Sequence, residues 1–124
     1  MDIDNKKATS LINEWVKRLG FQDWRIDLAW KCKPEETIIP GVVGASHFVE
    51  ETKMAEITIL DKQYYESDSK AFSFDFEETL VHELMHLKVC LLVQKDNDLQ
   101  ARMMHQLIDD MAKALVNAKR NEKI

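Results

Sequence analysis

The sequence lacks the features that would mark a nucleic-acid-binding, membrane or secreted protein. The 22 acidic residues outnumber the 17 basic ones, and the net charge of -5 argues against the concentrated positive face that phosphate binding needs. No apolar run approaches the roughly 18 residues of a membrane-spanning helix. No signal-like segment opens the chain, and the two cysteines, Cys32 and Cys90, form no CxxC pair. We therefore expect a cytoplasmic protein that binds neither nucleic acid nor membrane.

What the sequence does contain is the composition of a small globular protein. Its 124 residues are 45% apolar and 31% charged, which is enough to bury a core without disulfide or metal staples. Repeats and low-complexity tracts are absent. We therefore expect residues 1–124 to form a single domain.

Apolar periodicity divides the chain into one helix, three strands and two further helices. The predicted elements are a helix over 2–19 ended by Gly20, strands over 24–30, 42–51 and 54–61, and helices over 76–93 and 98–118. Gly44 is expected to form a bulge in the second strand. The apolar stripe expected to pack the last helix is Leu99, Met103, Leu107, Met111 and Leu115. This order predicts an α+β fold with one small sheet covered by helices.

The segment TLVHELMHL, residues 79–87, carries an HExxH motif on the fifth predicted element. His82 and His86 are four residues apart, so on a helix they point from the same face. Two imidazoles at this spacing can hold a zinc ion, which lowers the pKa of its bound water to about 7. Glu83 lies between them, where it can take a proton from that water. We expect His82 and His86 as zinc ligands and Glu83 as the general base.

The surroundings of the motif support this interpretation. Apolar residues flank it at Leu80, Val81, Leu84, Met85, Leu87 and Val89. Burying a glutamate and two histidines among them would be costly unless they met a metal or other partners. The alternative is that His82 and Glu83 lie at a helix edge in water.

A catalytic zinc site needs a third protein ligand and an open fourth position. Eighteen residues separate His86 from His105, enough for the chain to turn and return alongside. We expect His105 as the third ligand and Asp109, one turn further on, as an acceptor that fixes the tautomer of a ligand histidine. The alternatives are a surface histidine and a solvated carboxylate. Asp98, Asp109 and Asp110 are the reserve ligands, and Cys90 is either a fourth ligand or, as we favour, a buried thiol.

The motif resembles the active-site helix of the zincin metallopeptidases. Its spacing to His105 and Asp109 resembles the gluzincin pattern of thermolysin-like enzymes, except that gluzincins have a glutamate where this chain has His105. Histidine binds zinc equally well. The whole chain is also similar to short HExxH proteins of bacteria and their phages that are described as metallopeptidases on this motif.

The resemblance implies a minimal zincin-like domain. The short polar connection KDND, residues 95–98, predicts that the last helix packs antiparallel to the motif helix. The resemblance also implies that the strand at 54–60 is an edge strand, nearest the metal, that pairs with an extended substrate; the alternative is an interior strand. An oxyanion stabiliser is needed as well, and His47, Tyr64 and Tyr65 are the available donors.

Two functions fit these observations. The first is zinc-dependent peptide-bond hydrolysis by a small endopeptidase that binds one zinc ion per chain and a peptide or protein substrate. The second is a non-catalytic module on the same scaffold, with a structural zinc or a protein-binding role. Retention of Glu83 favours the enzyme, because a structural zinc site has no use for a base. At 124 residues the cleft is shallow or is completed by a protein partner.

Overall fold

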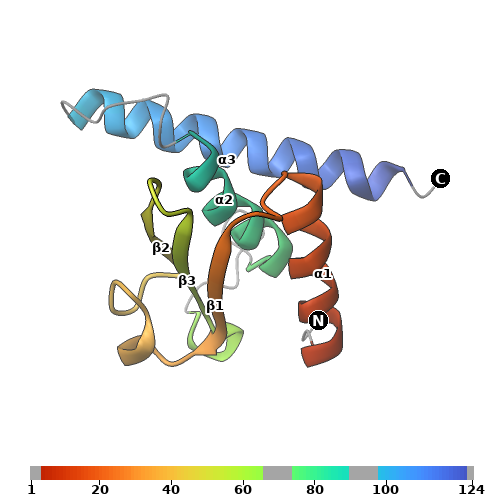
Figure 1. Ribbon diagram of the computed structural model, residues 1–124. Coiled ribbons are helices and arrows are strands. Elements are labelled where there is room, and N and C mark those ends of the chain that lie inside the picture. The colour runs from red at the N-terminus through yellow and green to blue at the C-terminus, as the bar shows by residue number, and fades with distance from the viewer. Residues whose placement is uncertain (1–3, 66–73, 90–97, 123–124) are drawn as a thin grey trace.

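The computed structural model describes residues 4–65, 74–89 and 98–122, and these form the α+β fold predicted from the sequence. Three α-helices and a three-stranded sheet follow one another as α1 (Asn5–Arg18), β1 (Arg25–Cys32), β2 (Gly44–Val49), β3 (Met54–Leu60), α2 (Phe76–Val89) and α3 (Asp98–Asn121). Short 3-10 helices, η1 (Pro34–Glu36) and η2 (Lys62–Tyr64), lie in the connections. In Figure 1, α3 lies across the top of the molecule, over α2, with the sheet and α1 on either side below. None of the described helices is long and apolar enough to cross a membrane.

Helix α1 begins and ends at residues whose chemistry favours a helix terminus. The side chain of Asp4 accepts a 2.7 Å hydrogen bond from the backbone N–H of Lys7, which satisfies one of the free donors at the start of the helix. After the last turn, Gly20 has a φ of 79°, a left-handed conformation that glycine adopts without strain. The predicted end of the first helix at Gly20 is therefore confirmed.

The sheet has the order β1-β3-β2, so β3 is its central strand. Strand β1 pairs with β3 in parallel, and β2 pairs with β3 antiparallel through the turn before Met54. The prediction that residues 54–60 form the edge strand is wrong, and the interior alternative is correct. Strand β2 is an edge strand instead. The physical reason is that β1, which precedes β2 in the sequence, pairs with the edge of β3 that β2 leaves free. Strand periodicity does not specify such a non-local pairing.

The predicted bulge at Gly44 is also wrong. The register between β2 and β3 is continuous from Gly44 to Val49. The irregularity lies in β1, between Ala29 and Cys32, where Lys31 has a positive φ of 61°. A glycine is needed at position 44 because α2 packs closely against this residue.

Helix α2 forms the centre of the core. Its most completely buried side chains are Leu80, Val81 and Leu84, each with 0% exposure, and they meet apolar residues from α1, the sheet and α3. Burial of each such side chain stabilises the fold by roughly 1.5–3 kcal/mol. The motif helix is therefore held on several sides, which keeps its polar residues in fixed positions.

Helix α3 buries a different stripe from the one we predicted. The buried residues are Met104, Ile108, Ala112 and Val116, each at most 6% exposed. Leu99, Met103, Leu107 and Met111 are 38–60% exposed, and Leu115 is only partly buried. Both rows repeat every four residues, so the spacing alone does not indicate which one faces the core.

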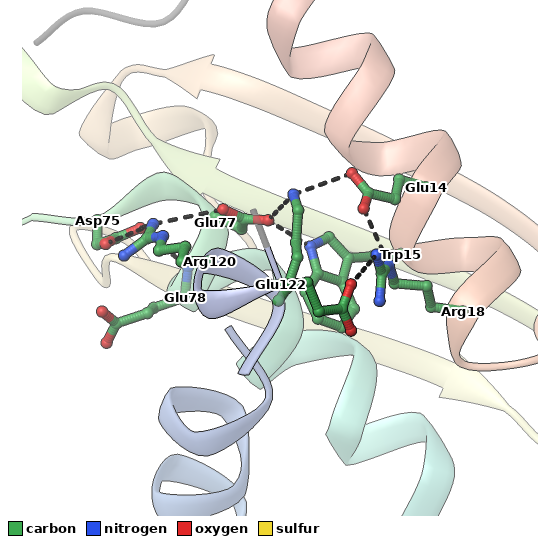
Figure 2. Close-up of polar contacts among 9 residues, drawn as sticks. Glu14, Trp15, Arg18, Asp75, Glu77, Glu78, Arg120 and Glu122 are labelled. Atoms are coloured by element: carbon green, nitrogen blue, oxygen red, sulfur yellow. Dashed lines mark hydrogen bonds and ion pairs between the residues drawn. The ribbon is translucent and has the colours of Figure 1, made fainter. Parts of the chain in front are cut away.

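A buried ionic cluster fixes the rotation of α3 (Figure 2). The carboxylate of Glu77, at the start of α2, is only 6% exposed. It accepts a 2.7 Å hydrogen bond from Nε1 of Trp15 and pairs with Lys119, and Arg120 lies 3.3 Å from its other oxygen. Lys119 also contacts Glu14 of α1 at 2.9 Å. A buried carboxylate needs such partners, so the cluster requires the Lys119 side of α3 to face inward.

Candidate metal centre

Helix α2 presents His82 and His86 one turn apart. Asp75 precedes the helix, and its side chain accepts a 3.1 Å hydrogen bond from the backbone N–H of Glu78, as an N-cap residue does. The regular helix that follows places the two imidazole rings 5.1 Å apart between centroids. Both rings are partly buried.

His105 completes a three-histidine cluster with this pair. Its ring centroid lies 4.7 Å from that of His82 and 5.6 Å from that of His86. One ring nitrogen from each histidine lies within 4.8 Å of the others. His105 is solvent-exposed, as the surface alternative required, but it faces the other two rings. The structure therefore brings together the three ligands expected from the sequence.

The donor set fits a zinc ion. Zinc accepts neutral imidazole nitrogens at 2.0–2.1 Å in a tetrahedron, which places ligand nitrogens about 3.3 Å apart. The nitrogens of the cluster, at most 4.8 Å apart, reach that separation by small rotations of the side chains. The exposure of His105 leaves one side of the cluster open, as a site with a free fourth position requires.

Asp109 lies against His82, one helical turn beyond His105. Its Oδ1 is 3.3 Å from Nδ1 of His82, and its other oxygen pairs with Lys113 at 2.9 Å. If Nδ1 carries the proton that Asp109 accepts, Nε2 of His82 is left as the ligand atom. Burial and the nearby His105 lower the pKa of His82, against the opposing effect of Asp109. His82 is therefore neutral near pH 7, the form that binds metal.

Glu83 is buried beside the histidines, with 5% exposure. The alternative of a water-exposed helix edge is therefore wrong for this residue. Burial raises the pKa of Glu83 to about 7, although a hydrogen bond with the Ser46 side chain partly offsets this. A carboxyl group with a pKa near 7 can both take and return a proton at neutral pH.

Gly44 makes room for the Glu83 carboxylate. A Cβ at this position would lie 2.8 Å from Oε2 of Glu83 and 2.9 Å from Cγ2 of Thr79. Sequence reasoning missed this contact, although a lone glycine in a strand is a known signal of close approach by another group. Strand β2, not β3, therefore borders the site.

An open cavity of about 620 Å³ lies over these residues. Its lining is Val42, Val43, Gly44, Tyr65, Asp75, Glu78, Thr79, His82, Glu83, His105, Asp109, Lys113 and Asn117. Of the three oxyanion candidates, only Tyr65 lines this cavity. Tyr64 is outside the lining, and His47 is on the opposite, solvent-facing side of β2, where it is 70% exposed and 3.9 Å from Glu56.

Of the reserve ligands, Asp109 and Asp110 are not part of the cluster, and the side chain of Asp98 lies outside the part of the chain that the structure describes. Asp98 begins α3, two turns before His105, and Asp110 is exposed and does not line the cavity. Asp109 contacts His82 rather than joining the nitrogen cluster. Cys90 is outside the described residues, so the prediction of a buried thiol stays a prediction.

Comparisons with protein-family models, with curated proteins and with solved structures find no match for this chain.

Proposed function

We propose that this protein is a small zinc-dependent endopeptidase with a zincin-like active site. His82, His86 and His105 are the zinc ligands, and Glu83 is the general base. The observation that carries the proposal is the arrangement of Glu83: a buried carboxylate stands beside three converging imidazoles and opens on the same cavity as two of them. A structural zinc site closes with four ligands and needs no such carboxylate.

The chemistry of each residue follows from its position. When bound, zinc would supply Lewis acidity that makes water nucleophilic near neutral pH and polarises the substrate carbonyl. Glu83 accepts the proton that water loses as its oxygen bonds to the carbonyl carbon. Glu83 then returns this proton to the amide nitrogen as the C–N bond breaks, so the carboxylate is regenerated with each cycle.

The substrate path that fits this site is the free edge of β2. Among the described strands, β2 pairs on one side only, and its first residue, Gly44, lines the cavity next to Glu83. An extended peptide that adds to this edge by main-chain hydrogen bonds would pass over the cavity. Tyr65, on the same lining, is the proposed donor to the developing oxyanion.

The contacts between the last two helices support the antiparallel packing that a zincin-like arrangement requires. Glu77 at the start of α2 meets Lys119 near the end of α3, whereas His82, further along α2, meets Asp109, which comes earlier in α3. Contacts that run in opposite directions along the two helices favour antiparallel axes. This packing presents His105 to the motif.

The decisive experiment separates metal binding from hydrolysis. Protein purified without a histidine tag is stripped with a chelator, reloaded with zinc, and assayed for metal content and for cleavage of a fluorogenic peptide library. We expect one zinc per chain and cleavage, with Glu83→Gln retaining the zinc but losing at least about 100-fold in kcat. Glu78→Gln, which alters another carboxylate of the cavity, is the matched control and should retain most activity.

Two outcomes would contradict the proposal. Full activity in Glu83→Gln would show that this residue is not the base. Stoichiometric zinc in the wild-type protein without cleavage of any library member would favour the non-catalytic module.

A further inference from the structure

The exposed row of α3, Leu99, Met103, Leu107 and Met111, forms a surface that we call the outer stripe. Their exposed fractions are 59%, 60%, 53% and 38%. These exposed fractions show that no other described element covers the outer stripe, and α3 itself lies along the top of the molecule in Figure 1. Residues 99 and 111 are separated by about 18 Å along the helix. Contiguous apolar surface of this kind typically marks an interaction site.

The charges beside the outer stripe indicate which partner fits it. Arg102 and Asp110 flank the stripe on the same side of the helix, eight residues apart and therefore about 12 Å apart along the axis. They are too far apart to pair with each other, and neither forms an ion pair with another described residue. Their midpoint is Gln106, close to the middle of the stripe.

This arrangement is self-complementary under a twofold axis. Two such helices can pack antiparallel with a twofold axis that passes between them at the level of Gln106. The axis places the equivalent flanks of the two helices next to each other, on the same side of the pair. Arg102 of one copy then lies level with Asp110 of the other, and the reverse pair forms as well. Arg102 and Asp110, which form no ion pair with any other described residue, would each gain a partner in this arrangement.

The apolar side chains fit the same axis. With the axis at residue 106, the stripe residues of the two copies alternate along the interface at intervals of about 3 Å. Leu107 of each copy lies beside the centre, Met103 and Met111 follow, and Leu99 is outermost. Side chains that alternate in this way interdigitate rather than collide.

We propose that the protein self-associates into a symmetric dimer through the outer stripes of two antiparallel α3 helices. The pairing leaves the metal site open, because His105 and Leu107 are about 200° apart around the helix axis. A membrane surface is a poorer occupant, since an interfacial helix flanks its apolar face with several Lys or Arg, whereas Arg102 and Asp110 cancel. The proposal does not depend on the catalytic role of the site.

Sedimentation of the metal-free full chain tests the proposal. Because a single helix pair is a small interface, measurements should extend to about 1 mM, where even the weakest specific dimer becomes populated. We expect a reversible monomer–dimer equilibrium. Leu107→Glu should weaken association at least about 10-fold, because it places two carboxylates near the axis. Met54→Glu, on an exposed apolar residue of β3, is the matched control and should leave association unchanged.

A charge exchange tests the symmetry. Arg102→Asp and Asp110→Arg should each weaken association about 10-fold, because like charges then face each other, and the double variant should return to within about 3-fold of wild type. A protein that stays monomeric throughout the concentration range overturns the proposal, as does binding of that monomer to phosphatidylglycerol vesicles. A dimer in which the double variant associates no better than the single ones also overturns it. Circular dichroism of each variant verifies that the helices persist.

Discussion

Gly44 and Glu83 are in such close contact that the glycine leaves no room for a side chain: a Cβ there would lie 2.8 Å from Oε2 of the carboxylate. The edge strand and the general base of the proposed mechanism are therefore coupled sterically. Any residue larger than glycine at position 44 has to displace the carboxylate, the Thr79 methyl group, or the strand itself.

Gly44→Ala should impair catalysis while sparing metal binding. The end of the Glu83 side chain can move more easily than the paired backbone of β2, so the carboxylate shifts away from its position beside the histidines. A displacement of about 1 Å can cost on the order of 100-fold in rate. The measurement is kcat together with zinc content per chain. Unchanged kcat in a correctly folded variant would show that the contact has no catalytic consequence.

Tyr65→Phe should lower kcat by about 100-fold if the hydroxyl stabilises the oxyanion, with little change in zinc content. Tyr64→Phe offers a matched control, because the neighbouring tyrosine does not line the cavity. Steady-state kinetics on one library substrate compare the two variants. Equal effects of the two substitutions would remove Tyr65 from the mechanism.

Asp109→Asn should weaken zinc binding by about 10-fold or more, because the amide is a poorer acceptor for the ring proton of His82. Asp110→Asn removes the adjacent, exposed carboxylate and should leave the affinity unchanged. Competition with a chromogenic chelator measures both dissociation constants. If both variants bind as tightly as wild type, Asp109 does not orient His82.

Glu83 should destabilise the metal-free protein progressively as the pH rises from about 4.5 to about 7. Its pKa is raised in the folded chain, from 4.5 to about 7, so the folded state favours the protonated form. The contribution of this group to stability is fully present below pH 4.5 and is lost as the pH rises through about 7. A glutamine at position 83 avoids this loss of stability, because its amide stays neutral at every pH of the experiment.

The free energy of unfolding of Glu83→Gln, relative to wild type, should therefore rise between pH 4 and pH 8 by about 3 kcal/mol, since each pKa unit corresponds to about 1.4 kcal/mol. Urea titrations in the presence of a chelator measure it. Glu56→Gln, at a side chain that is 66% exposed, should show no such trend. A flat difference for Glu83→Gln would mean that the carboxylate is solvated in the folded protein.

Lys119→Met should destabilise the fold by about 3 kcal/mol, because it removes a cation from the buried Glu77 carboxylate. Combining it with Glu77→Gln should recover part of that loss, since the uncompensated charge is then gone. Lys113→Met, on an exposed lysine of the same helix, should cost less than about 1 kcal/mol. Urea unfolding compares the variants. A loss for Lys119→Met no larger than that for Lys113→Met would show that the cluster does not anchor α3.

The sequence predicted the parts of the structure that depend on local spacing. His82 and His86 share a face because they are one turn apart, and Gly20 ends α1 because of its own conformational freedom. The approach of His105 also followed from the length of chain available for a return. These inferences need only the geometry of a helix and the reach of the connecting segment.

Other features depended on contacts between distant residues. The rotation of α3 is set by the contact of Lys119 with Glu77, 42 residues earlier. The spacing of the two apolar rows therefore could not predict which row faces the core. The central position of β3 follows from pairing with β1, about 30 residues earlier. Gly44 was the one missed feature with a local signal, because an isolated glycine in a strand indicates close packing against it.

The three proposed ligands are divided between two helices, and this division predicts a kinetic consequence. His82 and His86 are together whenever α2 is formed, whereas His105 joins them only when α3 has docked, and the cluster that anchors α3 lies about 20 Å further along that helix, at Lys119. An ion that meets the chain early would be held by two imidazoles and exchange rapidly. The metal ion would be retained tightly only after α3 has docked. The slow step of metal uptake would therefore be the docking of α3, and the two processes would have the same rate.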